Sequence, residues 1–534
     1  MVKKSVLILG AVSIAMVSIG FISGFYYSGW LSLQSQMAEE ANTLVIGTTK
    51  TLRLLDGAAI SNDIEIVLGS QIYETVLRAN PDTGKLEPLL AAEMPTVSDD
   101  GKTYTIKLKP GIKTTDGVEI TADVVKWSWQ TSFAEPETLA LVTGYFMDPD
   151  DPGSKIEVVN NYTLKIHLNT SFAPFDTCLA IPAMCVYSPQ HWDRTKDEFV
   201  GSGPWKFVHW LREEEVLLER NDDYWNKTEI PKFKQLLWKF YKSPSSLALA
   251  LREGTVDIAW RQLATPDLKS FSQDSNFKIV KAPGTRVVGI EINCGEAFAP
   301  LNDTRVRQAI SWLVDRDEII QKAYGGMGLH KLYSIAPDDW LGYNASALVF
   351  SPPNVEKAKQ LLTEAGYPTG FTTDFWISSS QYGDQIRSLA VVVQTQLAKA
   401  GITLNIKDME YTQWLTTKKG GMAPVATTHW CADYTDMYAY LFNYLSSSGD
   451  AETSEYNYYS AEADHLLAQA AQSNDTNQRL SIYKQIQDFA ASEGPVIIVG
   501  ALVEDAVVRK NIQGFYMPSD YYHTKFYQIT KTAD

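Results

Sequence analysis

The sequence has few of the residues that build metal sites and disulfide frameworks. Its 534 residues include only 4 cysteines and 7 histidines. No Cys-x-x-Cys pair occurs and the histidines do not cluster, whereas a structural zinc site needs about four convergent ligands. We therefore expect no metal and no cofactor. The cysteines, whose pairing is left open between disulfides and free buried thiols, are Cys178, Cys185, Cys294 and Cys431.

Signatures of hydrolytic enzymes are missing as well. Gly201-Ser202-Gly203 lacks the Gly-x-Ser-x-Gly spacing of a nucleophile turn, and no His-Glu-x-x-His zinc motif occurs. Asp433 and Asp436 could suggest general acid–base work, but two nearby acids in a loop more often face solvent or cap a helix. The sequence therefore predicts a protein that is not an enzyme, with an extracellular hydrolase as a minor alternative.

Positive charge is scarce. The chain carries 47 Lys and Arg against 63 Asp and Glu, a net charge of -16. Such an acidic surface repels phosphate backbones, so nucleic acid is excluded as an expected partner. Hydrophobic residues make up 45% and charged residues 21%, which is typical of a globular chain with an ample core. The length suggests about three domains or two large lobes.

One long hydrophobic run lies near the N-terminus. Lys3 and Lys4 precede an uncharged stretch, residues 5–38, whose apolar core is longer than the roughly 20 residues that span a bilayer. The two lysines favour a cytoplasmic N-terminus, which leaves the remainder on the extracellular face of the membrane. We expect a single-pass N-terminal transmembrane helix. A signal peptide cleaved near residues 37–41 is the alternative, although such peptides usually have a shorter apolar region.

After this hydrophobic run, the spacing of apolar residues predicts alternating strands and helices. Tyr104, Ile106 and Leu108 alternate with polar residues, as in a half-buried strand, and Thr121 is placed to cap a helix. From residue 287 onward the alternation predicts an α/β lobe with a largely parallel sheet, in which ligands sit beyond the carboxyl ends of the strands. Further strands are predicted at residues 43–48, 162–168, 216–219, 287–292, 402–406 and 425–428, and helices at residues 64–77, 245–253, 304–324, 354–365 and 385–400.

The clearest candidate for a binding site is an aromatic stretch around one acid, residues 429–437. Aromatic faces exclude water at low entropic cost. Asp433 would then lie in a drier medium, where pairing with an ammonium group is worth more than at the surface. Trp and Tyr beside a turn acid also occur at ordinary strand ends, and this alternative stays open. The residues of the candidate pocket are Asp433, Trp430, Tyr434, Tyr411 and Trp414.

Five segments in order carry a family resemblance. They read Ser-Asp-Asp-Gly-Lys-Thr-Tyr-Thr-Ile-Lys from residue 98, Phe-Val-Gly-Ser-Gly-Pro-Trp-Lys-Phe from 199, Leu-Leu-Glu-Arg-Asn-Asp-Asp-Tyr-Trp from 217, Leu-Asn-Asp-Thr-Arg-Val-Arg-Gln-Ala-Ile from 301 and Leu-Leu-Thr-Glu-Ala-Gly-Tyr-Pro-Thr-Gly from 361. Together they resemble the extracellular solute-binding proteins of peptide-type ABC transporters, family 5. The resemblance extends from about Leu44 to the C-terminus.

This resemblance implies a two-lobed α/β fold of the periplasmic-binding-protein-like type II, with an extra domain, that closes on its ligand like a hinged trap. It also implies a protein that captures solute outside the membrane, as a monomer, and delivers it to ABC permease subunits. The implied parts are residues 1–41 as cytoplasmic tip, anchor or signal segment and linker, residues 42–75, 200–284 and 500–534 as a discontinuous first lobe, residues 76–199 as the extra domain, and residues 285–499 as the second lobe.

The resemblance also implies roles for single residues. Trp430-Cys431-Ala432-Asp433-Tyr434 is similar to the oligopeptide-binding members, in which the acid at the position of Asp433 pairs with the α-amino group of a peptide. The implied peptide would lie extended between the lobes. The remaining implied contacts are a wall aromatic at Tyr411, a second wall residue at Trp414, a basic residue for the peptide carboxylate at Lys418 and a facing-lobe residue at Tyr145.

Some positions depart from the family pattern. A second basic position falls on Thr427, and an aromatic cluster of the closing lobe falls on Ile497–Val499. The cysteine that pairs with a residue like Cys431 would fall near Thr285, whereas the nearest cysteine here is Cys294. Amine recognition is therefore better supported than ligand length or carboxylate recognition. Relatives that take oligosaccharides, and an anchored sensor ectodomain, are the alternatives to a peptide-binding transport protein.

Overall fold

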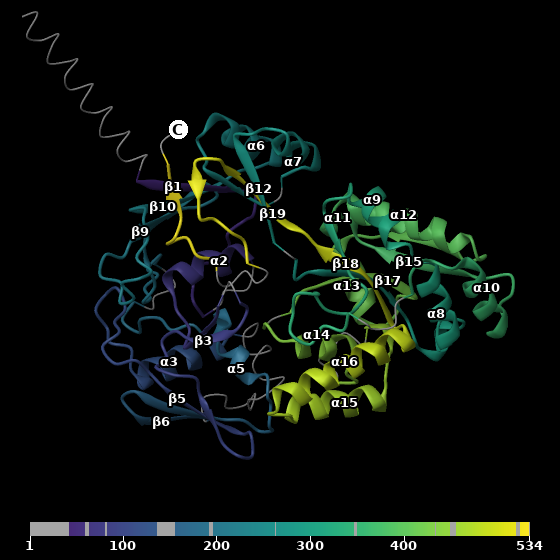
Figure 1. The fold of residues 1–534 in the computed structure, drawn as a ribbon, viewed down its shortest axis with the longest axis horizontal. Coiled ribbons are helices and arrows are strands. Elements are labelled where there is room, and N and C mark those ends of the chain that lie inside the picture. Colours follow the sequence, from purple (N-terminus) through teal and green to yellow (C-terminus); the bar gives the residue numbers. More distant parts are fainter. Residues whose placement is uncertain are drawn as a thin grey trace, which may run out of the picture.

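The computed structural model describes residues 42–58, 63–80, 83–135, 155–191, 196–261, 263–282, 284–345, 350–432, 434–448, 455–518 and 524–532. Figure 1 shows two halves side by side, with the strands β18 and β19 running from one to the other. In those ranges no helix is both long and apolar enough to cross a bilayer. The predicted transmembrane helix and two predicted site residues, Asp433 and Tyr145, lie outside the described residues.

The first lobe is built on a seven-stranded sheet. Its strands lie in the order β12-β19-β11-β1-β10-β9-β8, with β1 parallel to β10 and β11 and the other neighbours antiparallel. Helices α2, α6 and α7 pack on this sheet. The bounds are β1 Thr43–Thr48, α2 Asp63–Ile72, β8 Trp205–Leu211, β9 Glu215–Arg220, β10 Gln235–Phe240, α6 Pro244–Glu253, β11 Ile258–Trp260, α7 Thr265–Ser272, β12 Phe277–Ala282 and β19 Glu504–Arg509.

The second lobe is built on a six-stranded sheet in the order β14-β18-β13-β17-β15-β16. Only β17-β15-β16 is parallel, while β14, β18, β13 and β17 pair antiparallel. The predicted largely parallel sheet is therefore wrong, because apolar periodicity does not report strand direction. The bounds are β13 Val287–Ile292, β14 Leu329–Lys331, β15 Thr372–Ile377, β16 Thr403–Asp408, β17 Val425–Trp430 and β18 Val496–Leu502.

The described residues of the second lobe form nine α-helices. Two of them, α8 and α9, replace a single predicted helix. The prediction of a single helix over residues 304–324 fails at Val314, where the backbone turns extended and Asp315 caps a new helix by accepting from the Glu318 amide. The bounds are α8 Thr304–Leu313, α9 Arg316–Ala323, α10 Val355–Glu364, α11 Ser379–Tyr382, α12 Asp384–Ala398, α13 Tyr411–Lys419, α14 Met437–Leu445, α15 Ala461–Gln472 and α16 Thr476–Glu493.

A third region surrounds a four-stranded antiparallel sheet, β4-β5-β7-β6. The predicted strand around Tyr104 and the predicted cap at Thr121 are confirmed, since Thr121 accepts from the Val124 amide at the start of α3. The bounds are β2 Leu77–Ala79, β3 Leu86–Pro88, β4 Thr96–Val97, β5 Thr103–Lys107, α3 Ala122–Phe133, β6 Ile156–Asn160, β7 Thr163–His167, α5 Phe175–Cys178 and η2 Pro182–Met184, with η3 Glu296–Phe298, β20 Ile512–Gln513 and β21 Thr530–Lys531 elsewhere in the chain.

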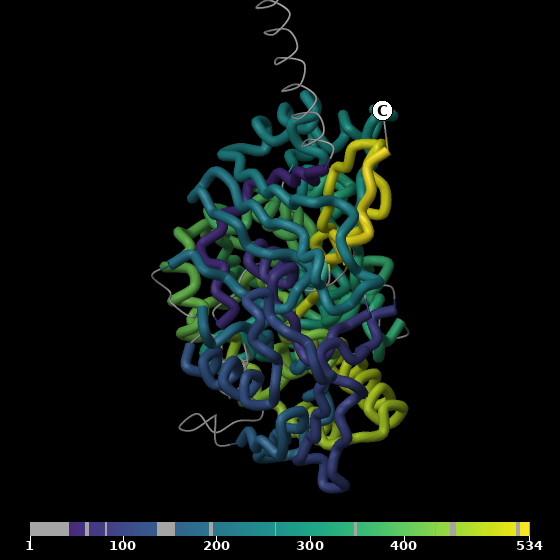
Figure 2. The backbone as a smooth tube through the Cα atoms, turned by 90° about the vertical axis from the view of Figure 1, so that its left-hand side faces the viewer, coloured from purple at the N-terminus to yellow at the C-terminus, as the bar shows by residue number. Residues whose placement is uncertain are grey.

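The third region packs against helices of the second lobe. Phe172 makes edge-to-face contacts with Tyr434 and Tyr438, with ring centroids 6.3 and 5.4 Å apart. The Ala173 amide donates to the Ala471 carbonyl at 2.6 Å. Side chains of both parts form one continuous hydrophobic core. Figure 2, turned from the first view, also shows the blue third region beside the yellow-green helices at the base of the molecule.

The chain crosses between the two large sheets twice, from β12 to β13 and from β18 to β19. The two crossings touch, because the Leu502 amide donates to the Arg286 carbonyl at 2.9 Å. Gly284 lies so close to the other crossing that an added Cβ would stand 1.4 Å from the Leu502 carbonyl oxygen. A side chain therefore cannot be accommodated at Gly284, and the lobes are joined by a tightly paired hinge.

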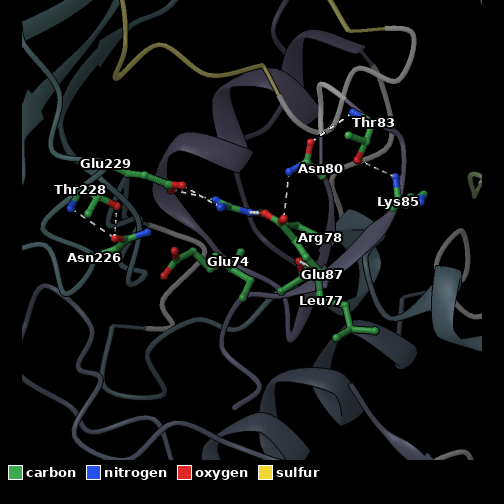
Figure 3. A network of polar contacts seen from close by, with 12 residues as sticks. Glu74, Leu77, Arg78, Asn80, Thr83, Lys85, Glu87, Asn226, Thr228 and Glu229 are labelled. Atoms are coloured by element: carbon green, nitrogen blue, oxygen red, sulfur yellow. Dashed lines mark hydrogen bonds and ion pairs between the residues drawn. The ribbon is translucent and has the colours of Figure 1, made fainter. Parts of the chain in front are cut away.

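A network of charged side chains holds the third region to the first lobe. Arg78 donates to both carboxylate oxygens of Glu229 at 2.7 Å and to Glu87 at 2.7 Å (Figure 3). Asn80 donates to the other oxygen of Glu87 at 2.9 Å. The bidentate pairing uses the planar fork of the guanidinium, the strongest geometry for such a contact.

Glu74 lies beside Arg78 and is buried (Figure 3). Its carboxylate accepts from the Ser202 hydroxyl at 2.6 Å, the Tyr224 hydroxyl at 2.6 Å and the Trp225 indole at 2.8 Å. Burial raises the pKa of Glu74, and these three hydrogen bonds oppose that rise. Each polar atom of the Glu74 carboxylate thus has protein partners.

Candidate functional site

A cavity of about 620 Å³ lies between the two lobes, beside both crossings. This size lies within the range of small-molecule sites, roughly 300–1,000 Å³. Both lobes and both crossings contribute to its wall, so closing or opening the lobes must change it. The lining residues are Lys50, Asp63, Leu263, Thr265 and Leu268 from the first lobe, Ala323, Tyr324, Gly325, Gly328, Gln381, Tyr382, Asp384, Gln385, Ser388 and His429 from the second, and Arg286 and Leu502–Asp505 from the crossings.

The second-lobe wall is formed where three parallel strands end. Tyr382 follows β15, helix α13 follows β16, and His429 lies at the end of β17. Because β15 pairs parallel with both β16 and β17, the three carboxyl ends meet at one edge of the sheet. The cavity therefore sits beyond the carboxyl ends of strands, where ligands of α/β sheets bind.

The first-lobe wall carries a chain of alternating charges. Asp63 contacts Lys50 at 3.2 Å and Arg261 at 2.8 Å, and Arg261 also contacts Glu504 at 3.4 Å. Burial alone would raise the pKa of Asp63, but the charges of Arg261 and Lys50 outweigh it and lower the pKa. Asp63 is therefore ionised at neutral pH and faces the cavity as an anion.

Asp505, next to this row of charges, has a raised pKa. Burial raises its pKa to about 6, and the neighbouring Glu504 carboxylate adds to the rise. Lys281 and Arg261 offset only part of this effect. Two adjacent acids at one crossing thus compete for a small amount of positive charge, which is the pattern that perturbed functional groups show.

Aromatic rings line the opposite wall. Tyr382 stacks on the imidazole of His429, with ring centroids 4.0 Å apart and planes inclined by 12°. Behind it, Tyr411 and Trp414 stack on each other at 6.0 Å, and Tyr382 meets both edge-on. Of this cluster, Tyr382 and His429 line the cavity and the two predicted wall residues, Tyr411 and Trp414, support them.

His429 has both ring nitrogens buried within this wall. Each nitrogen is shielded from solvent and has no hydrogen-bond partner among the residues that the structure describes. Burial lowers the pKa of His429 to about 3, with Arg286 and Lys418 adding repulsion. The imidazole is therefore neutral at pH 7 and offers one donor and one acceptor.

The predicted residues around Asp433 turn mostly away from the cavity. Trp430 lies on the face of β17 opposite to His429 and meets Tyr440 and Tyr444 edge-on, at 5.2 and 6.0 Å. Tyr434 is buried against Phe172. Ala432 is also buried, and Cys431 is partly exposed. The roles predicted for these residues stay predictions.

Lys418, the residue predicted to meet a ligand carboxylate, is buried among protein acids. Its ammonium contacts Glu291 at 3.0 Å and Glu455 at 2.6 Å. The exposed fraction of its side chain is 5%. A ligand carboxylate would have to compete with these two carboxylates, so its predicted role stays a prediction that this geometry does not favour.

The strand register shows whether Cys431 can form a disulfide with Cys294. In the antiparallel pair of β13 and β17, Val287 lies opposite Trp430 and Ile292 lies opposite Val425. Cys431 and Cys294 therefore lie beyond opposite ends of the pair, about eight residues or roughly 27 Å apart at about 3.4 Å per residue. A disulfide needs its two Cα atoms within about 7 Å, so these two cysteines cannot pair in this structure.

Several cavity residues were not among the predicted site residues: Lys50, Asp63, Arg286, Tyr382, His429, Glu504 and Asp505. His429 begins the predicted stretch, and its alternation with Trp430 along a strand was the signal that could have placed it on the other face. The charged residues come from four separate segments and carry no local motif.

Comparisons with known proteins agree with this architecture. The family model for bacterial extracellular solute-binding proteins, family 5 Middle, matches residues 85–452. Heme-binding protein A of Haemophilus influenzae is 28% identical over 514 residues, which cover 92% of each chain. The glutathione-binding protein GsiB of Pectobacterium atrosepticum is 26% identical over 90% of this chain and 92% of its own length. The dipeptide-binding protein of Escherichia coli is 27% identical over 83% and 86%.

Solved structures share the fold. HbpA2 from Haemophilus parasuis superposes with a TM-score of 0.82 at 24% identity, covering 92% of this chain and all (100%) of that one. DppA from Helicobacter pylori, in complex with the peptide STSA, gives a TM-score of 0.73 at 24% identity and covers 92% and 98%.

The fold, the inter-lobe cavity and the family match together define a solute-binding component of a transport system, a class without enzymatic activity. The chain belongs to the bacterial extracellular solute-binding proteins of family 5. The resemblance found in the sequence is thereby confirmed.

Proposed function

We propose that the protein captures short peptides in the cavity between its lobes and delivers them to the permease of an ABC importer. The observation that carries this proposal is the cavity of about 620 Å³ at the two crossings, walled by both lobes. It combines charges of both signs with stacked aromatic rings, which suits a ligand with an ammonium group, a carboxylate and an apolar part.

The names of similar proteins support a peptide or a peptide-like ligand. A dipeptide-binding protein and glutathione-binding proteins are among the relatives, and one structural neighbour holds the dipeptide Met-Leu. Other relatives and neighbours carry different names, including a heme-binding protein and a complex with agropinic acid. Haem, agropinic acid and oligosaccharides are therefore the rival ligands that an experiment must include.

The residue roles predicted from the family motif form part of this proposal. Asp433 pairs with the ligand ammonium, and Trp430, Tyr411 and Trp414 wall the site. Cys431, Ala432, Tyr434 and Tyr145 complete the proposed set, whereas the predicted carboxylate partner Lys418 is held between Glu291 and Glu455. If Asp433 is the ammonium partner, Asp433→Asn weakens peptide binding by about 2–5 kcal/mol, because a desolvated ammonium loses its counter-charge. Unchanged affinity in isothermal titration calorimetry would show that the assignment is wrong.

We also propose the placement of the protein at the cell surface. The apolar run of residues 5–38 acts as a single-pass anchor or as a cleaved signal, and the solute-binding part works outside the membrane as a monomer. Residues 42–75, 200–284 and 500–534 form one proposed lobe, residues 285–499 the other, and residues 76–199 the extra domain.

The test is native mass spectrometry of the full-length chain, purified in mild detergent without denaturation. Co-purifying peptides of mixed sequence, or thermal stabilisation by a dipeptide pool, are the expected results, since a ligand that binds only the folded state raises its stability. Stabilisation by haemin or an oligosaccharide pool, with none by di-, tri- and tetrapeptide pools, would overturn the peptide proposal while leaving the family assignment intact.

A further inference from the structure

The cavity contains a polar group whose hydrogen bonds are not satisfied by the described protein. Both ring nitrogens of His429 are shielded from solvent and lack partners in the ranges that the structure covers. A buried donor or acceptor left unpaired costs about 1–3 kcal/mol. The stacking on Tyr382 fixes the ring plane, so the imidazole cannot turn to another partner without losing that contact. A ligand in the cavity is the natural source of the missing hydrogen bonds.

Arg286 lies on the same face of the strand pair as His429. His429 is opposite Val288, and Arg286 precedes Val288 by two residues. Residues two apart in a strand point to the same face, and diagonal neighbours across a pair are within reach of long side chains. Both residues line the cavity, and the charge of Arg286 contributes to the lowered pKa of His429. A cationic side chain and a neutral imidazole therefore line the same cavity, close enough to interact electrostatically.

This pair matches one chemical group, the carboxylate. Two acceptor oxygens suit the guanidinium fork, and one of them can also accept the imidazole N–H. A doubly charged phosphate suits the cavity less well, because Asp63, Asp384 and Glu504 line the same space and repel a second negative charge.

We propose that Arg286 and His429 together bind a carboxylate of the ligand, and so make the cavity selective for short peptides with a free C-terminal carboxylate. This inference rests on the proposed function and names what that site selects. It replaces Lys418 as the carboxylate partner, since Lys418 is already held between Glu291 and Glu455 at 3.0 and 2.6 Å. Arg286 lies at the crossing between β12 and β13 and lines the cavity, so we place the ligand carboxylate there.

The test compares free acids with C-terminal amides. Isothermal titration calorimetry on the full-length chain in mild detergent uses Met-Leu and Ser-Thr-Ser-Ala, each also as its amide. We expect the wild-type chain to bind at least one free acid about 10–100-fold more tightly than its amide, as charge-assisted hydrogen bonds are worth about 1.5–3 kcal/mol. Arg286→Gln should remove most of that preference, lowering affinity for the acid and leaving affinity for the amide nearly unchanged.

Variants at His429 separate hydrogen bonding from packing. His429→Phe keeps a ring to stack on Tyr382 and should reduce the preference for the acid about 3–10-fold, as expected for one lost hydrogen bond. His429→Gln retains a donor and should restore part of it. Arg305→Gln is the matched control, because Arg305 is exposed and pairs locally with Asp303; its preference should equal that of the wild type.

Three results would count against the inference. Equal affinity of the wild-type chain for acid and amide would overturn it while supporting peptide capture. The same proportional loss for acid and amide in Arg286→Gln would also overturn it, because that pattern indicates a structural role. Binding of neither form of either peptide, together with stabilisation by haemin or a sugar, would instead overturn the proposed function on which the inference rests.

Discussion

Two charge networks of this protein differ in how completely they are satisfied. The network of Arg78, Glu229 and Glu87 is closed, with the guanidinium donating at 2.7 Å to each acid (Figure 3). The network that lines the inter-lobe cavity is open. There the two nitrogens of His429 have no hydrogen-bond partner in the part of the chain that the structure describes, and burial raises the pKa of Asp505 to about 6.

The difference indicates which network supports the fold and which serves a ligand. Buried polar groups are normally paired, and exceptions concentrate where function requires them. We therefore expect substitutions in the closed network to lower stability and leave ligand preference unchanged. Substitutions in the open network should do the reverse, because removing an unsatisfied group relieves the empty protein of its cost.

The largest expected effect comes from breaking the closed network. Arg78→Met leaves Glu229 and Glu87 without their shared cation, with exposed fractions of 12% and 32%. Removing one partner of a buried ion pair typically costs about 3–5 kcal/mol, and the partial exposure here places the expected loss at about 3 kcal/mol. Urea denaturation measures it. Arg305→Met, at an exposed local pair, should change stability by less than about 0.5 kcal/mol, and a similar small loss for Arg78→Met would contradict the comparison.

A substitution of Lys418 tests whether this residue supports the fold or binds the ligand. Lys418→Met leaves Glu291 and Glu455 close together and buried, so the free energy of unfolding should fall by about 2–3 kcal/mol. The preference for a free acid over its amide should persist, because we place the carboxylate at Arg286. Loss of that preference with stability intact would return Lys418 to the ligand site, as the sequence predicted.

Substituting Asp505 should increase stability, whereas the substitutions of Arg78 and Lys418 decrease it. Its pKa is raised in the folded protein, from 3.8 to about 6, so folding takes up a proton and the ionised group disfavours the folded state. This cost is absent below pH 4, grows between pH 4 and about 6 and is complete above that range. Asp505→Asn should therefore raise the free energy of unfolding by about 1–2 kcal/mol at pH 7.5 and by nothing near pH 4.

Thermal unfolding followed across this pH range measures the Asp505 effect. Asp99→Asn, at an exposed position, is the matched control. A gain in stability for Asp505→Asn that is independent of pH would show that its charge is not the cause.

The smallest expected effect at neutral pH is that of His429→Phe. Removing the unsatisfied nitrogens should raise the free energy of unfolding by about 0.5–1 kcal/mol at pH 7. The folded pKa is lowered from 6.5 to about 3, so the wild type loses stability as the pH falls through this range, because unfolded His429 takes up a proton. The advantage of His429→Phe should widen below pH 6.5 in thermal unfolding, and a constant difference would contradict a neutral buried imidazole.

Local sequence patterns predicted many elements of this fold. The strands at Thr43–Thr48 and Val287–Ile292 have the predicted bounds, since each is a short apolar run between polar or turn residues. Gly254 ends α6 in the left-handed conformation at a φ of 80°, as its position after a helical pattern predicts. Strand direction in the second sheet and the break at Val314 depend on tertiary packing, which no local pattern reports.

The candidate site was predicted only in part, because its residues are brought together by tertiary packing. Its aromatic residues form a dense stretch that sequence reveals, and Tyr411 and Trp414 do lie beside the cavity wall. The pleat of β17 then sends His429 and Trp430 to opposite faces, a distinction that needs the register. Asp63, Arg286 and Glu504 meet only because the crossings bring distant segments together.

Strand order in the two large sheets also has a consequence for export and folding. β19 lies between β11 and β12 in the first sheet, and β18 lies between β13 and β14 in the second, so strands from residues 496–509 are internal in both. Neither sheet can be completed before this late part of the chain has emerged. If the chain is secreted from its N-terminus, both sheets therefore lack an internal strand until translocation is nearly complete. Pairings between strands so far apart in the sequence also slow folding.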